Sequence, residues 1–173
     1  LNTLLQSAVQ GGLLVFLLLA LFLRPAVAFW VCVGVPVAFM GAIALMPWLG
    51  VTINIMSLFA FILVLGVVVD DAIVTGESIY SHLRQTPGSG SGLEAAINGT
   101  NAVAIPVTFG VLTTVAAFLP LATVGGMMGN FLSQIPLIVI PVLLFSIIES
   151  KFVLPTHLKH LSTGAEERPG PIL

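Results

Sequence analysis

The stretch Leu65-Gly66-Val67-Val68-Val69-Asp70-Asp71-Ala72-Ile73-Val74 places two adjacent acids inside an apolar run. This run ends a longer uncharged segment, because the 45 residues between Arg24 and Asp70 carry no charge. A second uncharged segment, of 54 residues, separates Glu94 from Glu149. A bilayer core needs about 20 apolar residues in a helix, so each segment is long enough to cross a membrane twice.

The composition of the chain also indicates a membrane protein. Of its 173 residues 58% are apolar and 7% are charged, whereas roughly 25% are charged in a soluble domain. The formal net charge of -2 gives too little basic character for a nucleic-acid partner. The single cysteine, Cys32, cannot form an internal disulfide, and no Cys/His cluster has the spacing of metal ligands. We therefore expect neither a metal nor another cofactor.

The sequence predicts an all-α integral membrane protein with five transmembrane helices. Helix breaks are expected at Pro47–Gly50 and at the glycine cluster Gly125–Asn130, because proline and glycine interrupt helices. A further apolar stretch precedes Arg24. The expected spans are residues 4–23, 26–47, 52–80, 97–123 and 131–154. Residues 1–161 would form the transmembrane domain, with a flexible linker at 85–92, and residues 162–173 a cytoplasmic tail.

The basic residues predict how these helices are oriented. All of them fall on one side of the expected bundle: Arg24, Arg84, Lys151, Lys159 and Arg168. The turns on the other side, near Gly50 and Gly126, carry no charge. The positive-inside rule therefore predicts a cytoplasmic C-terminus, with residue 1 outside the cytoplasm. Since residue 1 would already have to be translocated, we expect the chain to be part of a larger protein; the alternative is a complete small protein.

Asp70 and Asp71 are the strongest candidates for a functional site. A charge at the centre of a membrane helix costs about 2.5–3.5 kcal/mol, so intramembrane acids usually face protein or water and serve ion or proton pathways. Neighbours on a helix point about 100° apart, so both acids can face one crevice and titrate as a coupled unit. Alternatively, the pair lies near the cytoplasmic end of its helix and is simply hydrated. Every Lys and Arg lies in a loop or tail, so a cation facing the pair would come from outside this chain.

Four other polar residues are weaker candidates. Thr113 and Thr114 are possible secondary polar contacts of the acid pair, although such residues more often bond back to their own helix. Glu149 and Lys151 are expected to form an interfacial pair at the end of a span rather than to join the acids.

The histidines and tryptophans are expected to be structural or solvated. His82, His157 and His160 lie in segments predicted to be cytoplasmic, with no clustered partners. Trp30 is interpreted as apolar filling and Trp48 as an anchor at the membrane interface.

Several stretches resemble a known transporter family. Residues 66–74, followed by Gly76-Glu77-Ser78-Ile79-Tyr80, resemble the fourth-span signature of resistance-nodulation-division (RND) efflux permeases of the hydrophobe/amphiphile, or acriflavine-resistance, type. The resemblance implies that Asp70 and Asp71 are the family's adjacent proton-relay aspartates. Four flanking stretches agree in the same chain order. Residues 21–25 resemble the end of the family's span two and residues 36–41 its span three. Residues 49–54 resemble the entry to span four, and residues 118–121 the end of span five. The chain would then cover spans two to six of a twelve-span membrane domain.

The resemblance also implies a function and partners for the complete protein. It would be a proton-driven multidrug or amphiphile exporter, a secondary active transporter rather than an enzyme, with protons as its coupling ion. It would lie in the bacterial inner membrane as a homotrimer with a periplasmic adaptor and an outer-membrane channel. The other half of the membrane domain would supply the Lys and Arg that face the acids. The substrate is left open.

Three other functions fit the sequence less well. An intramembrane aspartyl protease needs two acids brought together from different helices. A sterol-sensing-type module has five spans but does not require adjacent aspartates. A structural membrane scaffold needs no buried acids.

Overall fold

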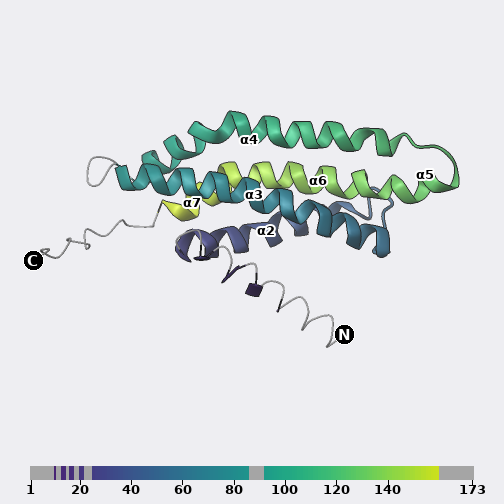
Figure 1. Ribbon diagram of the computed structural model, residues 1–173, viewed down its shortest axis with the longest axis horizontal. Coiled ribbons are helices and arrows are strands. Elements are labelled where there is room, and N and C mark those ends of the chain that lie inside the picture. The colour runs from purple at the N-terminus through teal and green to yellow at the C-terminus, as the bar shows by residue number, and fades with distance from the viewer. Residues whose placement is uncertain are drawn as a thin grey trace, which may run out of the picture.

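The computed structural model describes residues 25–85 and 92–159, together with residues 10, 13, 14, 16, 17, 20 and 21. The described part is helical and contains no strand (Figure 1). Four helices in it are long and apolar enough to cross a membrane: Val27–Leu45, Ile55–Gln85, Gly92–Ala122 and Gly126–Leu158. The count is thus four rather than the predicted five, because most of the first expected span, 4–23, lies outside the described residues. The expected tail 162–173 and the interior of the expected linker 85–92 also lie outside them.

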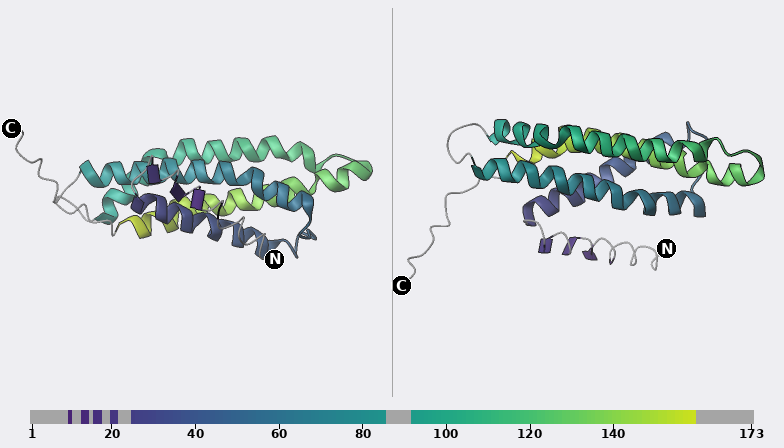
Figure 2. Two further views of the ribbon diagram at one scale, coloured as in Figure 1. Left: turned by 60° about the horizontal axis from the view of Figure 1, so that its bottom comes forward. Right: turned by 45° about the horizontal axis from the view of Figure 1, so that its top comes forward.

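The helices follow one another with short connections. The elements are α2 (Pro25–Leu45), α3 (Ile55–Gln85), α4 (Gly92–Ala122), α5 (Gly126–Leu132), α6 (Gln134–Ile148), the π-helical turn η1 (Glu149–Val153) and α7 (Leu154–Leu158). Figures 1 and 2 show α3, α4 and α6 running side by side along the long axis of the bundle. Helix α3 packs against α2, α4 and α6, so the stretch that carries the two acids lies on a central helix.

Both predicted helix breaks contain a glycine in the left-handed region of backbone conformation. Gly50 has a φ of 68° and Gly126 a φ of 80°, values that residues with a Cβ rarely adopt. The helical path resumes at Gly126, earlier than the expected start at residue 131, because α5 occupies most of the glycine cluster.

Side-chain hydrogen bonds fix the beginning of α3. The Ser57 backbone N–H donates to Oδ1 of Asn54, and the Asn54 backbone N–H donates to Oγ of Ser57, which is a reciprocal capping arrangement. The Asn54 amide also donates to Oε1 of Gln134, so the same residue joins the start of α3 to the start of α6.

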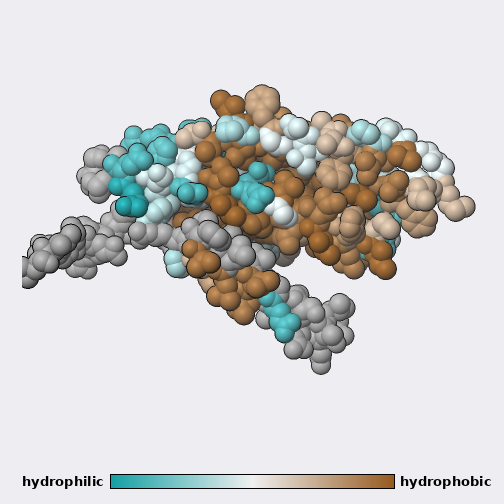
Figure 3. Space-filling model, in the orientation of Figure 1, coloured by the Kyte–Doolittle hydropathy of each residue, from teal (hydrophilic) through white to brown (hydrophobic). Residues whose placement is uncertain are grey.

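Two apolar clusters form the interior of the bundle, and α3 contributes to both. Val64 and Val68 pack with Val139 and Leu143 of α6, whereas Ala72 and Ile79 belong to the cluster that contains Leu154. Figure 3 shows apolar side chains over most of the visible face, with hydrophilic ones gathered where α3 ends and α4 begins. An apolar exterior with a polar end is the surface expected of a bundle in lipid.

Candidate functional site

Asp70 is the middle residue of α3 (Ile55–Gln85). The 31 residues of α3 give a helix about 46 Å long at about 1.5 Å per residue. A hydrocarbon core is about 30 Å thick, so a core placed anywhere along this length includes the middle of the helix. The length of α3 thus supports a position of the pair within the core, and the alternative of a hydrated pair near the cytoplasmic end stays a prediction.

The two acids differ in their surroundings. Asp70 is exposed on the surface of the described bundle, whereas Asp71 is only partly exposed. Within the described part of the chain, Oδ2 of Asp71 is buried and has no hydrogen-bond partner. A buried carboxylate oxygen without a donor is costly, so this atom requires a proton or a partner from elsewhere.

Thr113 and Thr114 form hydrogen bonds within α4. The hydroxyl of Thr113 donates to the carbonyl of Phe109 at 2.7 Å, and that of Thr114 to the carbonyl of Gly110 at 3.0 Å. These are the bonds to the preceding turn that threonine commonly makes in membrane helices. The suggestion that either residue contacts the acids stays a prediction.

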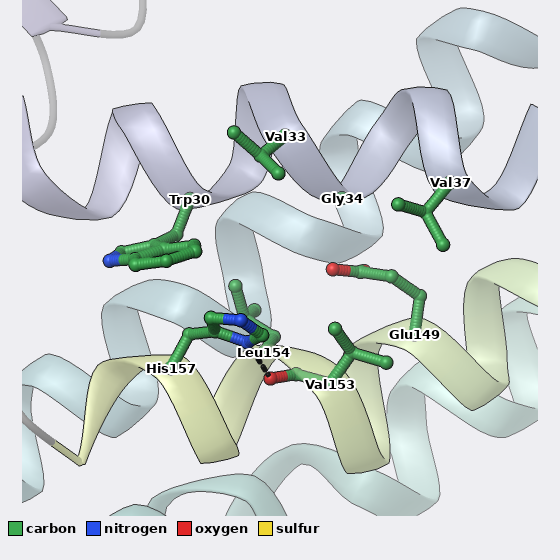
Figure 4. Close-up of a pocket in the computed structure, with 8 residues that line it drawn as sticks. All are labelled: Trp30, Val33, Gly34, Val37, Glu149, Val153, Leu154 and His157. Atoms are coloured by element: carbon green, nitrogen blue, oxygen red, sulfur yellow. Dashed lines mark hydrogen bonds between the residues drawn. The ribbon is translucent and has the colours of Figure 1, made fainter.

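Of the candidate residues named from the sequence, Glu149 has the surroundings that differ most from those expected. It is 4% exposed, and the structure contains no ion pair between it and Lys151. Its carboxylate lies directly against Gly34 of α2, at a position that a side chain on residue 34 would occupy (Figure 4). The expected interfacial pair is therefore wrong, because the path of α2 encloses Glu149.

The structure also corrects the expectation that His157 is solvated, whereas Trp30 packs against an apolar cluster as expected. Their rings pack together with centroids 4.1 Å apart, at an angle of 43°. Both line a pocket between α2 and the η1–α7 segment that also contains Glu149 (Figure 4). His157 is thus partly enclosed. By contrast, Trp48 is 89% exposed in the turn before α3, as an interface anchor would be, and His160 lies outside the described residues.

The sequence does contain one local sign of the unusual geometry at Glu149. Pro155 has no N–H to donate to the carbonyl of Lys151 four residues earlier, and such a gap in the ladder is relieved by a wider turn. The structure has the π-helical turn η1 over Glu149–Val153, just before this proline. Such π-turns occur frequently at functional sites.

Metal binding has no support among the residues that the structure describes. No three His, Cys, Asp or Glu side chains in that part of the chain lie close enough together to hold a metal ion.

Comparisons with known proteins give one consistent result. The family model described as "AcrB/AcrD/AcrF family" matches residues 1–166. The chain is 31% identical over 179 residues to the swarming motility protein SwrC of Bacillus subtilis, an alignment that covers 98% of this chain and 17% of SwrC. It is 40% identical over 130 residues to the multidrug resistance protein MdtC of Citrobacter koseri, covering 75% of this chain and 12% of MdtC. For MdtC of Escherichia coli O139:H28 the identity is 36% over 151 residues, with coverages of 87% and 14%. The chain thus spans less than a fifth of each of these relatives.

Proposed function

Because the chain belongs to the AcrB/AcrD/AcrF family of RND permeases, we propose that it forms half of the membrane domain of a proton-driven exporter of drugs or amphiphiles. The family predicted from the sequence is thereby confirmed. Membership of a permease family makes the complete protein a transporter rather than an enzyme. In this proposal Asp70 and Asp71 bind and release the coupling protons.

One observation carries the proposal: a pair of adjacent acids at the middle of a central membrane helix, with a buried oxygen of Asp71 lacking a partner in the described part of the chain. An acid at this depth that binds a proton becomes neutral and loses the penalty for a buried charge. Reversible protonation therefore gives the pair two states of different charge, which a proton-driven conformational change requires.

The exposure of Asp70 supports a specific role for the other half of the membrane domain. A charged carboxylate on an apolar bundle is costly against lipid, so the surface that carries Asp70 should face protein or water. We propose that the other half covers this surface and places a Lys or Arg opposite the pair. Protonation would then weaken that ion pair and change how the two halves pack.

The complete protein would lie in the bacterial inner membrane with the end that carries Gln85 and Gly92 in the cytoplasm. Its proposed partners are further copies in a trimer, a periplasmic adaptor and an outer-membrane channel. Supporting the orientation, hydrophilic side chains gather at the end where α3 ends and α4 begins (Figure 3).

The orientation predicts which positions an impermeant thiol reagent reaches from outside. In the complete transporter with Cys32→Ser, single cysteines replacing Gly50 and Gly126 should be labelled from the periplasm, whereas one replacing Gly88 should react only after lysis. Labelling at position 88 from outside, with none at 50 and 126, would invert the proposed topology.

The proposed transport is tested in cells that lack their own major exporters. Cells producing the complete protein should accumulate less of a fluorescent amphiphile than cells without it, and a protonophore should abolish the difference. The wild-type protein at the same expression level, measured without protonophore, is the control. Export that continues after the proton gradient is collapsed would contradict proton coupling.

A further inference from the structure

Glu149 lies at the same depth in the bundle as Asp71. Helices α3 and α6 begin side by side, since Asn54 donates a hydrogen bond to Gln134. Near the other end, a Cβ built on Gly92 would touch both the Leu83 side chain and the Lys159 carbonyl. Between these points, a Cβ on Gly76 would lie 3.9 Å from the Leu154 side chain.

These contacts define a parallel register between α3 and the α6–η1–α7 path. Residue 76 is level with residue 154, and both segments run in the same direction. Asp71 lies five residues before Gly76 on α3, and Glu149 lies five residues before Leu154 across the single turn η1, so the two acids lie at a similar depth. The membrane-spanning bundle therefore carries a third acid at the level of the proposed relay.

The carboxylate of Glu149 has no partner in the described part of the chain. The residue is 4% exposed, and its carboxylate oxygens, which have no hydrogen bond or ion pair to another described residue, are not fully buried but reach the pocket. It enters a pocket of about 140 Å³ whose remaining walls are mainly apolar (Figure 4). An acid enclosed in this way at membrane depth is expensive as a permanent charge, which is the usual sign of a site that binds a proton or a cation.

His157 gives the same pocket a second group that binds protons. Its Nδ1 lies 2.8 Å from the carbonyl oxygen of Val153, and since a carbonyl can only accept, Nδ1 donates this bond. In the neutral ring Nε2 is then the nitrogen free to take a proton. The ring lies against Trp30, whose aromatic face stabilises a positive charge.

Among the described residues, the other titratable groups near this pocket lie outside it. On the elements packed against η1 and α7, these groups are Cys32 of α2, six residues of α3 and Glu94 of α4. Lys151 in η1 and Lys159 just after α7 are the two further groups on the pocket's own segment. The six on α3 are Asp70, Asp71, Glu77, Tyr80, His82 and Arg84. None of these groups lines the pocket that Glu149 and His157 share.

We propose that Glu149 and His157 form a second proton-binding site, between α2 and the η1–α7 segment and at the depth of Asp71. Each group takes up one proton without any other bond being made or broken: the carboxylate becomes a carboxylic acid, and Nε2 of the imidazole becomes part of an imidazolium. His157 lies two turns closer than Glu149 to the polar end of the bundle, so it is the group nearer to the water on the proposed cytoplasmic side.

The site is tested by infrared difference spectroscopy of the complete transporter in lipid during acidification. Wild-type protein should show a protonated-carboxyl signal with a component that is lost in Glu149→Gln and retained in Asp71→Asn. The matched control is Glu77→Gln, which removes an exposed acid from α3 and should leave that component unchanged. Only variants that elute from a size-exclusion column at the same volume as the wild type are compared, so that misfolded protein does not contribute to the spectra. A Glu149→Gln spectrum identical to that of the wild type at every pH would overturn the proposal.

A second pair of variants separates proton binding from a structural role. Glu149→Asp keeps the acid and should shift the component without removing it, so it also serves if Glu149→Gln does not assemble. His157→Gln should change the midpoint of the Glu149 component, because it removes the second proton-binding group of the same pocket. An unchanged midpoint would remove His157 from the site. Failure of either test leaves the proposed function of Asp70 and Asp71 intact, because transport is not measured here.

Discussion

Export by the complete transporter is expected to fall to the level of cells without it when either Asp70 or Asp71 is replaced by asparagine. Asparagine nearly preserves the shape of aspartate but does not titrate, so each substitution removes a proton-binding group while leaving the packing of α3 in place. The effect should be large because coupling needs both charge states of the pair. Efflux is measured as accumulation of a fluorescent amphiphile at matched protein levels.

The control for this loss lies about two turns further along the same helix. Glu77→Gln also removes an acid from α3, but Glu77 is exposed near the polar end of the helix, so export should stay close to the wild-type level. Near-normal efflux in either aspartate variant, with normal expression, would remove that residue from the relay.

Replacing Gly99 by alanine should destabilise the bundle by forcing two of its helices apart. A Cβ there would lie 2.5 Å from the Cα of Ile79 and 2.9 Å from its backbone nitrogen, so α3 and α4 must move apart. The shift would also strain the bond from the Ser78 hydroxyl to the Gly99 carbonyl, now 2.7 Å long. Overpacking of this kind costs about 1–3 kcal/mol.

The matched variant on the same helix is Gly110→Ala. A Cβ on Gly110 would meet nothing within 4 Å in the described bundle, so this variant should be neutral or more stable by about 0.5–1 kcal/mol. The difference is measured as the midpoints of thermal unfolding of the purified Gly99→Ala and Gly110→Ala proteins in detergent. Equal midpoints for the two variants would contradict the close approach of α3 and α4.

The membrane helices and the acid pair could be predicted because their signals are local. Long uncharged runs define the spans, and the turns need Gly50 and Gly126 for their left-handed backbone. The adjacency of Asp70 and Asp71 is likewise a property of the sequence itself. Their place at the middle of α3 followed only from the full length of this helix, which continues to Gln85 rather than ending at residue 80.

The surroundings of Glu149 could not be predicted from the sequence because they depend on distant residues. Its charged neighbour Lys151 suggested an exposed pair, but its burial comes from Gly34 on another helix, which leaves space for the carboxylate. The contact of Trp30 with His157 has the same origin, since α2 must first pack against the η1–α7 segment.

The central claim, that Asp70 and Asp71 couple proton movement to export, is tested most directly with the purified complete transporter in proteoliposomes. A pH-sensitive dye inside the vesicles reports how fast an imposed proton gradient decays with and without an exported amphiphile. The amphiphile should accelerate the decay for the wild type and for Glu77→Gln, but not for Asp70→Asn or Asp71→Asn. Amphiphile-dependent decay at the wild-type rate in either aspartate variant would contradict the account.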